Sequence, residues 1–237
     1  MEAGRRLVAL DVLRGLTIAG MLVVNTPGTW EHVYPPLRHA EWNGWTYTDT
    51  IFPFFLFIVG VSMALSFGRR IEEGAGRGDL LRHAVQRGAA IFAIGLALNV
   101  LSYILFDKAH LRIPGVLQRI GICYLAAALV YLLLGRRGLL PSAGLLLLLY
   151  WALMTLVPVP GYGAGRLDVE GNFAAWVDRA LLDQHTWKPG WDPEGPLSTI
   201  PAAASTLLGA LAGKLLRSKL AGKGKLTALI GAGAVGI

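Results

Sequence analysis

His39 and Asp49 are the residues of this sequence whose types and spacing best suit proton-transfer chemistry. Histidine is the side chain whose charge ordinarily changes between about pH 5 and 8, and a carboxylate can orient its ring. Such a pair can serve as a general base or as a nucleophile. A solvated loop histidine and an aspartate that simply complements a helix dipole are the alternative interpretations.

The segment that carries this pair runs directly into an uncharged apolar stretch from Ile51 to Phe67. A stretch of this length, with Pro53 in its first turn, predicts a membrane-spanning helix. The Trp and Tyr residues immediately before it are typical of a membrane interface. We therefore expect His39 to lie next to the membrane, on one defined side of it.

The composition of the chain also indicates a membrane protein. Its 237 residues are 54% hydrophobic and 16% charged, with a mean hydropathy of +0.52, whereas soluble domains have roughly 25% charged residues. The net charge of +7 would suit nucleic-acid binding in a soluble protein. Here the cations lie in short loops between apolar runs, so no nucleic-acid partner is expected. Cys123, the only cysteine, allows no intrachain disulfide and no cysteine-rich metal site, and we expect no metal.

The apolar runs predict an all-α fold, a polytopic transmembrane helix bundle in a single domain, 1–237. Six full spans are expected, at Leu7–Val24, Ile51–Phe67, Gly88–Phe106, Pro114–Leu134, Leu139–Val159 and Leu197–Ala212. Residues 68–87 are a connection rich in Gly and Arg, with a flexible linker at 74–78. Leu226–Ile237 starts a seventh span, but about twelve residues are too few to cross a bilayer. Because the sequence ends inside this apolar run, we expect it to be the N-terminal part of a longer protein.

The lysine and arginine residues divide unequally between the two sets of alternate loops. Fourteen lie in the set that includes the N-terminus and residues 68–87, and six lie in the set that includes residues 25–49 and 160–196. Cation-rich loops remain in the cytoplasm, so the N-terminus is predicted to be cytoplasmic. We assign the chain to a bacterial inner membrane, with His39 and the long connection on the periplasmic side.

The long extracytoplasmic connection 160–196 has predicted order of its own. Phe173, Trp176, Val177, Ala180 and Leu181 recur at helical spacing, with Asp178, Arg179 and Asp183 on the opposite face. This pattern predicts an amphipathic helix on the membrane surface. A rigid turn that includes Asp192 and Glu194 then leads into the sixth span, and these acids are either plain loop charges or members of a site.

Ionisable residues inside spans are costly and suggest functional sites. Arg14 and Asp11 lie one helical turn apart on the first span. They either form a local ion pair or present a buried cation to an anionic ligand from the cytoplasm. Arg119 follows Gln118 on the fourth span, near its His39 side. Because its own helix has no acid near it, Arg119 is expected to face the bundle interior.

Six blocks of the sequence resemble the membrane core of the heparan-α-glucosaminide N-acetyltransferase family. They are Leu-Asp-Val-Leu-Arg-Gly (10–15), Val-Asn (24–25), His-Ala-Glu-Trp-Asn-Gly-Trp-Thr (39–46), Thr-Asp-Thr-Ile-Phe-Pro-Phe-Phe-Leu-Phe-Ile-Val-Gly (48–60), Arg-Ile-Pro-Gly-Val-Leu-Gln-Arg-Ile-Gly (112–121) and Asp-Pro-Glu-Gly-Pro-Leu-Ser-Thr (192–199). The blocks follow the family's order and cover nearly the whole chain. Two departures concern the acceptor: Glu41 stands where the lysosomal enzyme has a small residue, and the lysosomal N-terminal luminal domain is absent from this sequence.

The resemblance implies transfer of an acetyl group from cytosolic acetyl-CoA to an amino sugar or sugar hydroxyl across the membrane. It implies His39 as the catalytic histidine and Asn25 as the asparagine at the outer end of the first core helix. From its residue type and spacing, Asp49 is expected to orient the histidine. The residues expected to bind the substrate and the acyl-CoA are Asp11, Arg14, Trp42, Asn43, Gln118, Arg119, Asp192 and Glu194.

In the implied reaction, His39 would either deprotonate the acceptor or take the acetyl group itself, and Asn25 or Arg119 would polarise the thioester carbonyl. The expected partners are the lipid bilayer, acyl-CoA as acyl-donor substrate and a carbohydrate acceptor, and a homodimer is compatible with the sequence. An amino-sugar transporter is the second interpretation, because bacterial relatives have been assigned that role. Transport predicts unwound helices in inverted repeats, and the sequence has no such repeat. A non-catalytic membrane scaffold is a third interpretation.

Overall fold

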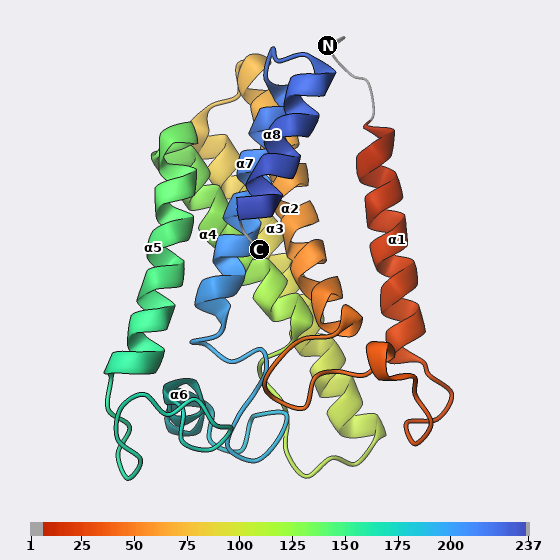
Figure 1. Cartoon of the computed structure of the whole chain (residues 1–237), viewed down its shortest axis with the longest axis vertical. Coiled ribbons are helices and arrows are strands. Elements are labelled where there is room, and N and C mark those ends of the chain that lie inside the picture. Colours follow the sequence, from red (N-terminus) through yellow and green to blue (C-terminus); the bar gives the residue numbers. More distant parts are fainter. Residues whose placement is uncertain (1–6, 236–237) are drawn as a thin grey trace.

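The computed structural model describes residues 7–235, and its helices assemble into one bundle (Figure 1). The elements are α1 (Val8–Asn25), η1 (Pro35–Leu37), α2 (Tyr47–Glu72), α3 (Arg77–Leu105), α4 (Val116–Leu133), α5 (Gly135–Leu156), α6 (Phe173–Leu182), α7 (Thr199–Arg217) and α8 (Gly222–Val235). Helices α1 to α5 and α7 are long and apolar enough to cross a membrane. The predicted all-α bundle with six full spans is thus confirmed.

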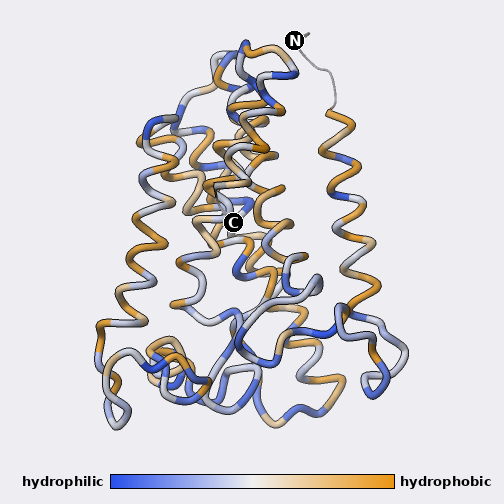
Figure 2. The backbone as a smooth tube through the Cα atoms, viewed as in Figure 1, coloured by the Kyte–Doolittle hydropathy of each residue, from blue (hydrophilic) through white to orange (hydrophobic). Residues whose placement is uncertain are grey.

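The connections between the spans gather at the two ends of the bundle (Figure 1). The N-terminal end carries the α2–α3 turn, the α4–α5 junction and the start of α8. The His39 end carries the loop 26–46, the α3–α4 loop and the connection 157–198 with α6. Figure 2 shows hydrophobic residues along the helices and many hydrophilic residues in the loops at both ends. This distribution is that of a multi-pass membrane protein.

Helices α2 and α7 form the tightly packed centre of the bundle. A Cβ atom at Gly60 would lie 1.9 Å from the carbonyl oxygen of Thr206, and one at Gly209 would lie 2.1 Å from the carbonyl oxygen of Phe57. Both distances are far inside van der Waals contact, so the two backbones can approach only because these residues are glycines. Close approach over small residues is a common way for membrane helices to associate.

Helix α2 begins four residues before the apolar run that predicted it. Thr46 is its N-cap and forms a capping box with Asp49, so the polar residues before Ile51 are already helical. Pro53 is therefore the seventh residue of α2, and its predicted place in the first turn was wrong.

The predicted connection 68–87 is mostly helical, which corrects the expectation of a loop. Helix α2 continues to Glu72 and α3 begins at Arg77, because arginine and glutamate are good helix formers even where the apolar run has ended. Gly74 has a φ of +89° in the turn between them, and this left-handed conformation favours glycine. The linker predicted at 74–78 is thus a tight turn followed by the start of α3.

The remaining helices lie at the margins of this core. Helix α1 packs along α2 and stands apart from the other spans in Figure 1. Helix α6 confirms that the connection 160–196 contains a helix, capped by Asn172, whose Oδ1 accepts a hydrogen bond from the Ala175 N–H at 2.8 Å. Helix α8 corresponds to the start of the seventh span. The last two residues of the predicted Leu226–Ile237 segment and residues 1–6 lie outside the described residues.

Candidate functional site

A cavity of about 780 Å³ opens at the His39 end of the bundle. Its walls come from the end of α1, the loop before α2, the α3–α4 loop, α5, α6 and the turn before α7. Six of the predicted site residues line it, namely Asn25, His39, Trp42, Asp49, Asp192 and Glu194. The volume falls within the roughly 300–1,000 Å³ of small-molecule sites. Segments far apart in the sequence therefore converge on one candidate site.

His39 and Asp49 form a hydrogen-bonded pair on the wall of this cavity. The ring Nδ1 of His39 lies 2.6 Å from Oδ1 of Asp49. Oδ2 of Asp49 accepts hydrogen bonds from the backbone N–H groups of Ala40 at 3.1 Å and Thr46 at 2.9 Å. The aspartate thus caps α2 and orients the imidazole at the same time. Because Nδ1 is engaged, Nε2 is the nitrogen left for chemistry, and the side chain is 66% exposed, so a substrate can reach it.

Three tryptophans contribute an aromatic wall to the cavity. Trp42 and Trp191 meet edge to face with ring centroids 5.3 Å apart, and Trp187 meets Trp191 in the same way at 5.7 Å. The indole Nε1 of Trp42 donates to the carbonyl oxygen of Leu167 at 2.7 Å, which fixes its orientation. Nζ of Lys188 lies 4.7 Å from the Trp187 ring centroid. Such a wall can hold both an apolar ring face and a cation.

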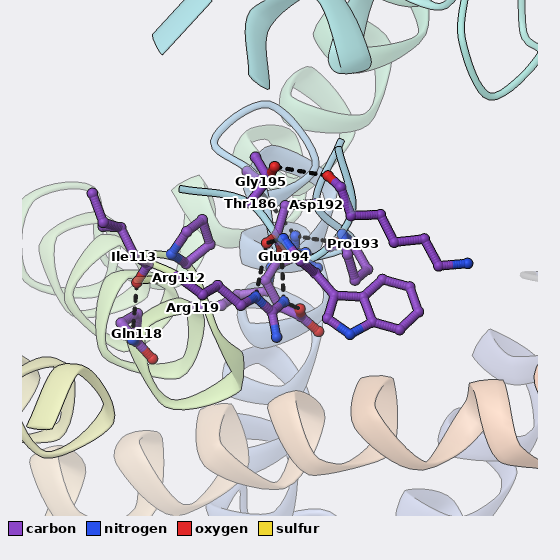
Figure 3. A network of polar contacts seen from close by, with 12 residues as sticks. Arg112, Ile113, Gln118, Arg119, Thr186, Asp192, Pro193, Glu194 and Gly195 are labelled. Atoms are coloured by element: carbon purple, nitrogen blue, oxygen red, sulfur yellow. Dashed lines mark hydrogen bonds and ion pairs between the residues drawn. The ribbon is translucent and has the colours of Figure 1, made fainter. Parts of the chain in front are cut away.

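A charged network supports the turn that leads into α7 (Figure 3). Arg112 makes a bidentate contact with Asp192, with Nε 2.8 Å from Oδ2 and Nη2 2.6 Å from Oδ1, and it also pairs with Glu194. The Asp192 side chain is fully shielded from solvent and accepts from the backbone N–H groups of Trp187 and Glu194. Burial disfavours the charge of Arg112, but the two acids outweigh it and raise the pKa of Arg112. The network holds Glu194 at the cavity wall.

Asp178 of α6 also lines the cavity. The sequence placed it on the polar face of a helix on the membrane surface, but the residue is only 2% exposed. Its Oδ2 accepts a hydrogen bond from the Asp192 N–H at 2.9 Å, whereas its Oδ1 is buried without a partner among the described residues. Burial raises the pKa of Asp178 to about 6, and the nearby charge of Asp192 adds to that rise. A proton can therefore be held here in mildly acidic conditions.

Arg119 faces the bundle interior as predicted, and it is 8% exposed. Its Nη2 donates to the carbonyl oxygens of Pro193 at 2.6 Å and Gly195 at 3.4 Å and to the Ser198 hydroxyl. Gln118 donates to the carbonyl oxygen of Ile113 at 3.0 Å (Figure 3). Among the described residues, these two side chains are not part of the cavity lining. They instead anchor the backbone segments that carry it.

The other predicted binding residues lie away from the cavity. Arg14 pairs with Asp11 at 3.3 Å and donates to the Ser62 hydroxyl at 3.1 Å. It precedes Asn25 by eleven residues, which places it about 16 Å along α1 from the His39 end. Of the two alternatives for Arg14, the structure shows the local ion pair with Asp11 and not a buried cation. The side chain is 41% exposed because α1 packs mainly against α2. Asn43 is exposed in the loop before α2.

Several cavity residues were not assigned to the site from the sequence, among them Arg112, the acid Asp178, and the tryptophans Trp187 and Trp191. Arg112 begins one of the blocks that resemble the family, which is the one signal that could have identified it. Its partner Asp192 lies eighty positions away, so sequence spacing gave no indication of the pair. Asp178 was not identified because an acid on the polar face of a short helix is ordinarily a surface charge.

Comparisons with known proteins identify the family of this chain. The family model for heparan-alpha-glucosaminide N-acetyltransferase, catalytic, matches residues 6–233. The human heparan-alpha-glucosaminide N-acetyltransferase is 33% identical over 89% of this chain and 38% of its own length, and the mouse protein of the same name is 31% identical over 91% and 40%. The chain therefore spans about two fifths of the length of these curated relatives. Since the family model covers nearly every residue, the chain belongs to the heparan-alpha-glucosaminide N-acetyltransferase family.

Proposed function

We propose that the protein transfers an acetyl group from cytosolic acetyl-CoA to an amine or hydroxyl of a sugar at the His39 end, outside the cytoplasm. The observation that carries this proposal is the 2.6 Å contact between His39 and Asp49 on the wall of a 780 Å³ cavity. A histidine held by a carboxylate is the arrangement of a general base or nucleophile. The names of the human and mouse relatives specify an N-acetyltransferase.

The proposed reaction uses Nε2 of His39 to take the proton of the acceptor. The freed acceptor atom attacks the acetyl carbonyl carbon, its bond to that carbon forms, and the carbon–sulfur bond of the thioester breaks. The departing CoA sulfur then receives the proton from the imidazolium. Asp49 stabilises the imidazolium through Nδ1, and Asn25, on the same cavity, can donate to the carbonyl oxygen as negative charge develops. An acetyl-histidine intermediate is the two-step version of the same transfer.

The acceptor would bind against the acids and the aromatic wall of the cavity. Glu194 lies in the lining and is held by Arg112, and carboxylates favour a hydroxyl or ammonium donor over an anion. Trp42, Trp187 and Trp191 offer apolar faces that suit the C–H face of a sugar ring. The cavity therefore favours a neutral or cationic sugar rather than an anionic substrate.

Transport is the competing function for a membrane protein with a polar cavity. Many transporters bind their substrate near the bilayer midplane, at the ends of interrupted helices. In the described residues, each of the six spans is one continuous helix, and the cavity lies at one end of the bundle. These features favour an enzyme that works at the membrane surface.

The activity is tested with radiolabelled acetyl-CoA, a panel of amino sugars and the natural full-length protein. We expect labelled product from the wild type and at least a hundredfold less from His39→Ala, because a positioned base contributes about 10²–10⁴-fold. His83→Ala, an exposed histidine on α3 towards the opposite end, is the matched control and should keep the wild-type rate. Native rates in His39→Ala would exclude this mechanism.

The direction of transfer is tested by cysteine labelling in a Cys123→Ser background, since Cys123 is the chain's single cysteine. Cysteines at the exposed positions Thr29 and Glu170 should react with a membrane-impermeant maleimide in intact spheroplasts, because they lie at the His39 end. Cysteines at Gly78 and Gly222 should not react until the membrane is opened. The reverse pattern would contradict the orientation that rests on the fourteen-to-six division of cations.

A further inference from the structure

A second cavity, of about 380 Å³, lies at the N-terminal end of the bundle. It is an open cavity, lined mainly by the last turns of α2, α4 and α7 and by the start of α3, which meet at this end in Figure 1. Among the described residues that line it, Arg77, Lys214 and Arg217 are positively charged and Glu72 is the acid. The lining therefore carries an excess of two positive charges.

Two of these cations lie where a helix dipole favours positive charge, and the third lies where the dipole opposes it. Lys214 and Arg217 lie in the last turn of α7, where a positive charge complements the helix dipole. Arg77 is the first residue of α3, directly after the N-cap Gly76, where the dipole opposes a positive charge. Its presence beside two other cations is thus not explained by helix stability. An anion in the cavity would offset the excess of positive charge in the lining.

Arg217 is held in a fixed orientation in the cavity wall. Its Nη1 donates to the carbonyl oxygen of Leu65 at 3.1 Å, and its Nη2 lies 2.6 Å from Oε1 of Glu72. A Cβ at Gly68 would lie 2.5 Å from Nε of Arg217, so the glycine makes room for this side chain. A guanidinium has five N–H donors, so others remain for a ligand after these two contacts.

Lys214 and the Ser218 hydroxyl are also placed around this space. Nζ of Lys214 lies 4.1 Å from the centroid of the Tyr131 ring, which fixes the ammonium at the wall. The Ser218 hydroxyl oxygen is buried and has no hydrogen-bond partner among the described residues. A buried hydroxyl without a partner is costly, and an oxygen-rich ligand in the cavity would satisfy it.

We propose that this cavity binds the phosphate group of a phosphate ester. A phosphate accepts hydrogen bonds from arginine, lysine and hydroxyl groups alike, and its negative charge matches the excess of cations. Two sources have this chemistry. One is the headgroup of an anionic phospholipid, because basic pockets between membrane helices meet such headgroups. The other is a phosphate of the CoA donor. The assignment to CoA rests on the proposed function, whereas the assignment to a lipid does not.

Binding is measured on the detergent-purified natural full-length protein by native mass spectrometry, with phosphatidylglycerol, phosphatidylcholine and CoA as separate probes. The double variant Arg77→Gln, Lys214→Gln should lose about tenfold or more in affinity for the probe that occupies the cavity, because each lost charge-assisted contact costs that order of affinity. Arg82→Gln removes an exposed cation of the same helix that is outside the lining. This matched control should bind like the wild type.

Selective loss of phosphatidylglycerol binding in the double variant would assign the cavity to a lipid, and selective loss of CoA binding would assign it to the donor. The proposal would be overturned if the double variant bound each of the three probes as tightly as the wild type does. It would also be overturned if Arg82→Gln lost as much affinity as the double variant. The thermal unfolding midpoint shows whether each variant is folded. If the double variant does not fold, Arg77→Gln alone gives the same test, since Arg77 is exposed. None of these measurements requires acetyl transfer.

Discussion

The two ends of the bundle carry cavities of opposite character. At the His39 end, acids and tryptophans surround a histidine, and the central ion pair joins Arg112 to Asp192, whose side chain is 0% exposed. At the N-terminal end, cations dominate, and the ion pair of Arg217 uses Glu72, which is 76% exposed. Buried pairs depend strongly on both partners, whereas exposed pairs contribute little. This difference is what we expect if the proposed chemistry takes place at the His39 end and the proposed anion binds at the other.

The largest expected difference between the ends concerns the rate of acetyl transfer after an aspartate in the first turn of a helix is changed. Asp49→Asn should lower acetyl transfer by about 10²–10⁴-fold, because the amide can cap α2 but cannot stabilise the imidazolium of His39. Asp79→Asn makes the same change in the first turn of α3 at the other end and should leave transfer unchanged. The measurement is the initial rate with labelled acetyl-CoA. A similar loss in both variants would mean that the effect is not specific to the His39 cavity.

The second difference concerns stability and uses another matched pair of acid-to-amide changes. Asp192→Asn should lower the free energy of unfolding by about 3–5 kcal/mol, towards the lower limit because Glu194 still pairs with Arg112. Glu72→Gln should cost no more than about 1 kcal/mol, since its side chain is exposed and screened by solvent. Denaturant titration in detergent micelles measures both. Equal costs at the two ends would remove the energetic distinction between a buried and an exposed ion pair.

Hydropathy alone was sufficient to locate the spans, because an uncharged run of membrane length has few other stable environments. The first span was predicted at Leu7–Val24, and α1 is Val8–Asn25. The errors fall where helices leave the apolar zone. Helix α2 extends to Glu72 and includes Arg69 and Arg70, since helix formation depends on local propensity and capping as well as on membrane burial.

Sequence spacing could suggest only those contacts of the candidate site that are close in the sequence, whereas Asn25, Asp192 and Glu194 were assigned to it from the resemblance to the family. His39 and Asp49 are ten residues apart, and the carboxylate was proposed to orient the histidine ring, as the 2.6 Å contact allows. Arg112 and Asp192 are joined only because the α3–α4 loop and the turn before α7 meet at one end of the bundle. Arg119 was correctly predicted to face inward, but its backbone partners at Pro193 and Gly195 required the structure. Long-range pairing is set by tertiary packing, which spacing does not encode.

The smallest predicted effect is a change in stability with pH that Asp178 causes at the His39 end of the bundle. Its pKa is raised to about 6 in the folded protein from an ordinary value of 3.8, first by burial. The folded state therefore binds the proton more tightly than the unfolded state does. The resulting stabilisation is complete below about pH 4 and is lost as the pH rises through about 6, where the buried carboxyl becomes charged. The loss is about 3 kcal/mol at most, since one pKa unit corresponds to about 1.4 kcal/mol.

Two substitutions separate this titration from the hydrogen bond that Asp178 accepts from Asp192. Asp178→Asn keeps an acceptor for that N–H but cannot titrate, so its unfolding midpoint should rise relative to the wild type between pH 4.5 and about 7.5. Asp178→Ala also cannot titrate but loses the acceptor, so its curve should run parallel to that of Asp178→Asn at a lower temperature. Thermal unfolding in detergent at a series of pH values measures all three proteins. If the unfolding midpoints of the wild type and Asp178→Asn differ by the same amount at every pH in this range, the buried carboxyl does not change its charge. The prediction of a pH-sensitive carboxyl at the His39 end would then be wrong.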